Sequence, residues 1–128
     1  MKKETVFNSD SHFEHKQWRR ELFFWEDEIR SFRNRLSELA VRWTDKEVLA
    51  QLEQYQNKFV IQENSIHELE GHINSHEINI AEHTKKGEDV LNQKLVKNHT
   101  EYRKRMEIQR NLYNNLKKEF FHFLSKYM

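Results

Sequence analysis

The 128-residue sequence contains no cysteine, no proline and only two glycines, Gly71 and Gly87. Because there is no cysteine, disulfide bonds, cysteine-based zinc sites and thiol nucleophiles are excluded. The scarcity of proline and glycine argues against β-sandwiches, β-barrels and the glycine-rich loops that bind nucleotides. The remaining composition favours long, uninterrupted helices.

Long apolar runs are also missing from the sequence. We find no signal peptide and no run of roughly 20 apolar residues that would cross a membrane, so we expect a cytoplasmic protein with no membrane partner. Apolar residues make up 36% of the chain and charged residues 34%. The apolar fraction is low for a compact globule, but it is enough for helices that bury one narrow seam and expose the remaining surface.

Charge is distributed unevenly, although the net charge is only +1. Residues 1–44 carry a net charge of +1, residues 45–84 carry −6 and residues 85–128 carry +6. An acidic helix next to a basic helix favours the antiparallel pairing that a short loop imposes. A basic face on the third segment that contacts nucleic acid is the alternative interpretation.

Apolar residues recur in alternating steps of four and three along three segments. The central seam begins at Val48 and ends at His83, and the two flanking segments carry the same repeat. A heptad seam of this kind holds one helix face against partner helices along its whole length. The sequence therefore predicts an all-α fold, an elongated antiparallel three-helix bundle with coiled-coil-like seams and helices at about residues 12–42, 45–84 and 88–127. We expect residues 1–10 to be a short polar N-terminal arm and residues 11–128 to be a single domain.

Capping patterns indicate where these helices begin and end. Ser11 with Glu14, and Thr44 with Glu47, have the spacing of capping boxes, which predicts helix starts at Ser11 and Thr44. Gly87 follows two lysines, as expected at the end of the second helix. The acidic residues 88 and 89 then suit the first turn of the third helix.

The three seams also agree in register. If the turns are centred at residue 44 and between residues 85 and 86, the seam residues of the three helices meet in about ten shared layers. One layer is polar, with Trp25 level with Gln62 and Gln109. We expect this layer to fix the register, as a buried polar residue does in coiled coils.

Five of the eight histidines gather at one end of the predicted bundle. His12 and His15 are three residues apart and His72 and His76 are four apart, so each pair lies on one helix face. The register brings His15, His76 and His99 into the same seam. Because imidazole binds zinc, nickel, copper or iron, these five residues are a candidate transition-metal site. The alternative is a hydrogen-bonded or protonatable histidine cluster at the wetter end of the bundle.

Some large apolar residues do not belong to the seams. They are Phe13, Phe23 and Phe24 on the first helix and Val60 and Ile61 on the second. Because a contiguous exposed apolar patch marks an interface, these residues predict a homodimer or a protein partner. Scattered exposure without an interface is the alternative.

The seams contain no recognisable catalytic constellation. No serine has a base and an orienting acid at a familiar spacing, and inward carboxylates are almost absent, so we expect no enzyme activity and no small-molecule substrate. The aromatic residues of the basic third helix belong to the core, which disfavours stacking on nucleic-acid bases. We therefore predict a non-catalytic interaction or assembly module. A transition-metal-binding bundle is the first alternative, and a nucleic-acid accessory protein is the second.

Overall fold

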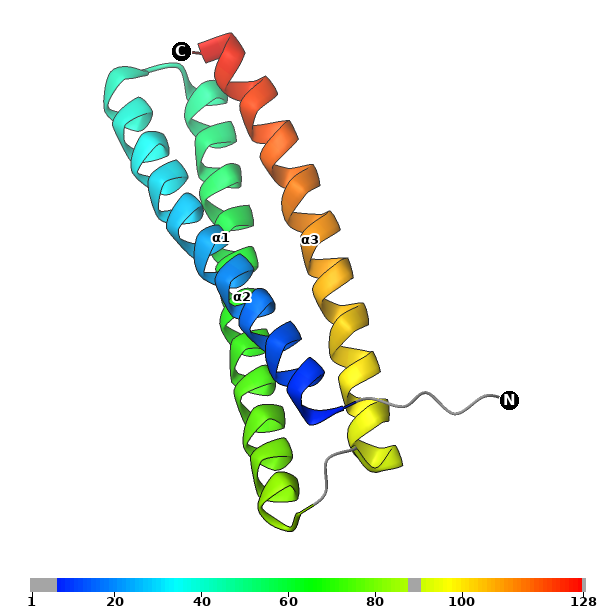
Figure 1. Ribbon diagram of the computed structural model, residues 1–128. Coiled ribbons are helices and arrows are strands. Elements are labelled where there is room, and N and C mark those ends of the chain that lie inside the picture. The colour runs from blue at the N-terminus through cyan, green and yellow to red at the C-terminus, as the bar shows by residue number, and fades with distance from the viewer. Residues whose placement is uncertain (1–6, 88–90, 128) are drawn as a thin grey trace.

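The computed structural model describes residues 7–87 and 91–127 and confirms the three-helix bundle. Helix α1 spans Asn8–Arg42, α2 spans Lys46–Lys85 and α3 spans Gln93–Tyr127. Figure 1 shows the turn between α1 and α2 at the same end as the last turn of α3, while the first turn of α1 lies near the start of α3. Helix α2 is therefore antiparallel to both neighbours, and α1 and α3 are parallel to each other.

The first two helices do not begin at the residues that the capping-box patterns predicted. Helix α1 starts at Asn8, so the last three residues of the predicted arm are helical, and Ser11 lies inside the helix instead of capping it. Helix α2 is capped by Asp45 and not by Thr44. The Asp45 carboxylate accepts hydrogen bonds from the backbone N–H groups two and three residues later, at 2.8 and 3.3 Å. It thereby satisfies N–H groups that have no partner within the helix.

The third helix starts later than predicted. Asn92 caps α3, because its Oδ1 accepts a hydrogen bond from the Leu95 N–H at 2.9 Å. The acidic residues on which the predicted start rested, 88 and 89, lie outside the described residues. Gly87 ends α2 as expected, with a φ of 81° that glycine adopts without steric cost.

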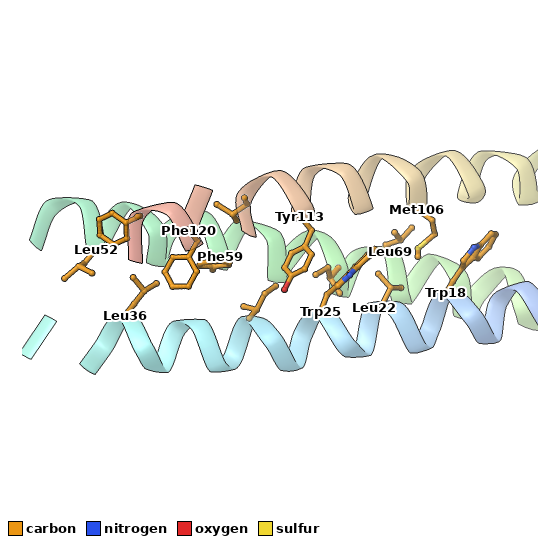
Figure 2. Packing of buried hydrophobic residues seen from close by; sticks show 14 of the residues in the cluster. Trp18, Leu22, Trp25, Leu36, Leu52, Phe59, Leu69, Met106, Tyr113 and Phe120 are labelled. Atoms are coloured by element: carbon orange, nitrogen blue, oxygen red, sulfur yellow. The ribbon is translucent and has the colours of Figure 1, made fainter. Parts of the chain in front are cut away.

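The heptad seams form the core. Figure 2 shows side chains from all three helices pointing into one shared interior. Phe59 is fully buried, and its ring packs against Phe32 and Phe120 with centroid distances of 5.5 and 5.0 Å. Trp25 and Tyr113 form a similar pair at 5.5 Å. Aromatic side chains thus fill the space between the helices along most of the bundle.

The polar layer forms between α2 and α3. The Gln109 side chain donates a hydrogen bond to Gln62 Oε1 at 2.6 Å, which confirms the predicted register of these two helices. Trp25 lies in the same core, where its indole packs on Tyr113.

Three ion pairs connect the parallel helices α1 and α3 at intervals of seven residues. They join Glu14 to Arg103, Glu21 to Arg110 and Glu28 to Lys117. Three basic residues of α3 are thereby engaged within the bundle, which weakens the nucleic-acid interpretation of that helix. Across the described part of the chain, no helix has an apolar stretch long and continuous enough to cross a membrane.

Candidate metal centre

The structure brings His15, His76 and His99 together, one from each helix. Their exposed fractions are 0%, 2% and 1%. The ring centroids are 5.0 to 5.5 Å apart, and one nitrogen of each ring lies within 4.8 Å of a nitrogen on each of the other two. This cluster could hold a metal ion.

The heptad repeat accounts for the burial of these histidines. Each occupies a seam position, three or four residues from an apolar seam residue such as Trp18 or Ile73. The Trp18 indole stacks on the His99 ring at 5.1 Å. The histidine layer lies toward one end of the bundle, where a small apolar cluster around Ile80 and Leu95 is separate from the main core.

Four donor atoms converge at the centre of the cluster. His99 Nδ1 lies 3.2 Å from His15 Nε2 and 3.3 Å from His76 Nε2. The hydroxyl of Ser11, which is fully buried, lies 3.1 Å from His99 Nδ1 and 3.5 Å from His15 Nε2. One hydroxyl oxygen and two imidazole nitrogens therefore lie within 3.5 Å of His99 Nδ1, and none of these four groups belongs to an acidic, lysine or arginine side chain.

Carboxylates hold the outer nitrogens of two of these rings. Glu77 accepts a hydrogen bond from His15 Nδ1 at 2.5 Å, and Glu14 accepts one from His99 Nε2, also at 2.5 Å. A carboxylate on the outer nitrogen fixes the imidazole tautomer with the proton outside, so that the inner nitrogen carries a lone pair. Arg19 and Arg103 contact the same carboxylates at 3.3 and 3.0 Å.

The pKa values follow from burial and from these contacts. Burial alone raises the pKa of Glu14, but hydrogen bonds from Arg103 and His99 lower it below its ordinary value overall. The pKa of Glu77 is lowered in the same way, as hydrogen bonds from two histidines outweigh burial. Both carboxylates are therefore charged at neutral pH.

Burial acts in the opposite direction on the histidines, because it disfavours the charged imidazolium. It lowers the pKa of His76 to about 4, and neighbouring histidines add to the shift. It also lowers the pKa of His15, although the hydrogen bond to Glu77 partly opposes the change. These two rings are thus neutral at pH 7, the form that binds metals. Among the described residues, His76 Nδ1 has no hydrogen-bond partner.

Two of the five predicted ligands lie outside this buried cluster. The His12 side chain is 56% exposed, and its Nδ1 hydrogen-bonds the second oxygen of Glu77. The His72 side chain is 43% exposed, lies near Glu68 and stacks over Tyr102. His12 is therefore connected to the cluster through Glu77, whereas His72 is connected to it through Tyr102, whose ring packs against His76 at 5.1 Å.

Three residues of the site were not predicted from the sequence: Ser11, Glu14 and Glu77. Ser11 was assigned to a cap, although it lies four residues before His15 and so continues the seam if the helix starts earlier. The two glutamates occupy flanking heptad positions, which predicted outward side chains. Each is next to a seam histidine of its own helix and bends across to hydrogen-bond a histidine of a neighbouring helix.

Ser11, His99 and Glu14 also form a hydroxyl–imidazole–carboxylate chain, the arrangement that activates a nucleophile in hydrolases. A substrate would have to reach the Ser11 hydroxyl, which is fully buried inside the bundle. We therefore do not assign a hydrolytic role to this chain.

A second group of candidate ligands lies on the α1–α2 face: Glu26, His67 and Glu70. His67 Nε2 is 3.0 Å from Glu26, and the His67 side chain is 57% exposed. Burial and a hydrogen bond to Glu26 raise the pKa of Glu70 to about 7. A proton shared between the two carboxylates accounts for their proximity without a metal ion.

The predicted interface residues are divided between surfaces. Phe23 and Phe24 are 72% and 58% exposed and line one shallow depression, with Lys117 of α3 beside the Phe24 ring. Val60 is half-buried in a different, polar depression between α1 and α2. Phe13 and Ile61 are exposed as well. A partner on these surfaces stays a prediction.

Comparisons with models of known protein families, with curated proteins and with solved structures found no match. The function is therefore inferred from the residues of this chain and their geometry.

Proposed function

We propose that this protein binds one divalent transition-metal ion, with zinc as the preferred ion, through His15, His76 and His99. The Ser11 hydroxyl would lie at the fourth corner. The observation that carries this proposal is the spacing of four buried donor atoms, whose four measured separations run from 3.1 to 3.5 Å. Zinc–nitrogen bonds of about 2.0–2.1 Å in a tetrahedron separate neighbouring donors by about 3.3–3.4 Å.

The orientation of the lone pairs supports a cation at this point. If His15 and His99 donate their outer N–H groups to Glu77 and Glu14, the inner nitrogens of both rings are unprotonated. Those two nitrogens face each other at 3.2 Å. A proton between them would relieve the repulsion, but the lowered pKa of His15 opposes that proton. A metal ion accepts both lone pairs at once, and a third from His76.

The donor set favours zinc over the other ions. Three imidazoles and a hydroxyl, with four separations of 3.1 to 3.5 Å, suit a d¹⁰ ion that has no geometric preference of its own. Copper(II) prefers tetragonal geometry, in which neighbouring donors about 2.0 Å from the ion are only about 2.8 Å apart. The four residues that supply the donors have exposed fractions of 2% or less. Such closure is typical of structural zinc sites, whereas catalytic sites keep a position open for substrate. The proposed role is therefore a non-catalytic one, in which the ion joins the three helices.

Metal titration of protein purified without a histidine tag tests the proposal. Zinc at pH 7.5 should bind at one equivalent per chain in calorimetry and should raise the melting temperature, because it binds only the folded state. Cobalt(II) should give the intense visible bands of a tetrahedral complex. His76→Ala should abolish all three signals, whereas His72→Ala, one turn away on the same helix, should leave them unchanged. Equal loss in both variants, or no binding to the unmodified protein, would reject the site.

A second proposed function is the predicted assembly role, in which Phe23 and Phe24 contact a second copy of the chain. Two neighbouring phenylalanines with exposed fractions above one half support it. Light scattering at micromolar concentration should then detect a dimer, and Phe24→Glu should return it to a monomer. A monomer at all concentrations would remove the homodimer and leave only a different protein as the partner.

A further inference from the structure

The first two turns of α1, residues 8–15, are attached to the bundle differently from the rest of the helix. From Trp18 onward the residues that α1 buries are all apolar. Before Trp18 the buried residues are Ser11 and His15, and the only large apolar side chain of the segment, Phe13, is 63% exposed. Residues 8–15 therefore contribute no apolar side chain to the core.

The other attachments of this segment are polar contacts near the surface. Asn8 donates a hydrogen bond to the Thr84 hydroxyl at 2.7 Å, in an exposed position. Glu14 pairs with Arg103, and His12 pairs with Glu77. Exposed contacts of this kind contribute little to stability, because water and salt compete for the same groups.

We propose that residues 8–15 form a lid that docks firmly on α2 and α3 only when a metal ion occupies the histidine cluster. This inference rests on the proposed metal site. His15 belongs to the lid, whereas His76 and His99 belong to the other two helices, so bonds to one ion cross from the lid to both of its neighbours. In the metal-free protein the lid is held by hydrogen bonds and ion pairs alone, among them the hydrogen bonds of Ser11 with His99 and of His15 with Glu77, and by no apolar side chain.

Undocking of the lid changes the surface of α2. Ile80 is 4% exposed and lines a depression whose other wall is formed by Asn8, Ser9 and His12 of the lid. When the lid leaves, this apolar residue and the inner faces of His76 and His99 become accessible to solvent. Loss of the metal ion is thereby converted into exposure of an apolar surface, which is the behaviour of a metal-responsive switch.

Hydrogen exchange of the full-length chain, with zinc and with a chelator, tests the lid. At free zinc about 100 times its dissociation constant, lid opening should be suppressed about 100-fold, because the ion binds only the closed form. The amides of residues 12–17 should therefore exchange about 100-fold faster in chelator. The amides around Phe59 and Tyr113, in the centre of the bundle, should exchange by global unfolding. The ranking of their exchange rates should be the same in zinc and in chelator.

The comparison with and without zinc requires no variant, and calorimetry on the same samples reports binding separately. If zinc binds but the amides of residues 12–17 exchange equally fast in both conditions, the lid is rejected and the metal site stands. If zinc does not bind, both proposals fail. His15→Ala should remove the zinc-dependent protection, and the matched His72→Ala should preserve it. Loss of protection in both variants would contradict the lid.

Discussion

The Glu77 carboxylate contacts three side chains, and only one of them is a proposed ligand. It hydrogen-bonds His15 inside the bundle and His12 at the surface, and it lies 3.3 Å from Arg19. Because it holds the His15 ring with its inner lone pair toward the cluster centre, Glu77→Gln should weaken zinc binding by about 10- to 100-fold. Calorimetric titration at pH 7.5 measures this change. Glu68→Gln, on an exposed glutamate of the same helix, should leave the affinity unchanged, and equal affinities in all three proteins would contradict the role of Glu77.

His76 provides a second prediction, which concerns pH. Burial lowers its pKa to about 4 in the folded protein, whereas an unfolded histidine has a pKa of about 6.5. Between these values the unfolded chain binds more protons, so stability is highest above pH 6.5 and falls as the pH falls. The metal-free protein should lose about 2 kcal/mol of unfolding free energy between pH 7 and pH 5 from this residue. Urea unfolding in chelator measures the loss. His76→Gln should flatten the curve in this interval, and an unchanged slope would assign the effect to other groups.

Helices α2 and α3 are joined at mid-length by the amide pair of Gln62 and Gln109. Gln109 is 6% exposed, so removing its partner leaves a buried amide unsatisfied. Gln62→Leu alone should cost about 1 kcal/mol, because a lone buried amide loses its hydrogen bonds to water without replacement. The double change to leucine should cost less than the sum of the two single changes, since both amides are removed together. If urea unfolding shows that the cost of the double change equals the sum of the two single costs, this hydrogen bond contributes little to the coupling of the two helices.

The bundle as a whole depends on large side chains at the seam positions. Phe59 is fully buried and touches aromatic rings from both neighbouring helices, so Phe59→Ala should cost about 3–5 kcal/mol of unfolding free energy. Ile61→Ala, two residues later on the exposed side of α2, should change stability by less than about 0.5 kcal/mol. Thermal and urea unfolding test the pair. A loss below about 1 kcal/mol for Phe59→Ala would mean that the core is not packed as described.

The sequence predicted the architecture well, because a seven-residue repeat without proline leaves few other folds for the chain. It also predicted that His15, His76 and His99 point into the same seam, with His15 and His99 at one level and His76 one layer further toward the end of the bundle. It did not predict the carboxylates, because a heptad position gives the direction of the Cβ atom and not the path of a long side chain. Glu14 and Glu77 leave the helix on its flank and then reach across to a neighbouring helix. The start of α1 was missed since the capping-box spacing of Ser11 and Glu14 also fits the interior of a helix.

Every donor atom proposed for the metal ion is a ring nitrogen or a hydroxyl oxygen, and the chain contains no cysteine. Zinc sites made of thiolates depend on groups that peroxide converts to sulfenic acid and disulfide, forms that no longer bind the ion as thiolates do. Imidazole does not undergo that sequence of oxidations, and zinc has no redox chemistry of its own. The zinc-loaded protein should therefore keep its ion in hydrogen peroxide concentrations that empty a cysteine-based zinc finger, and should release it when acid protonates the histidines. Acid would therefore release the bound ion from this bundle, and oxidants would not.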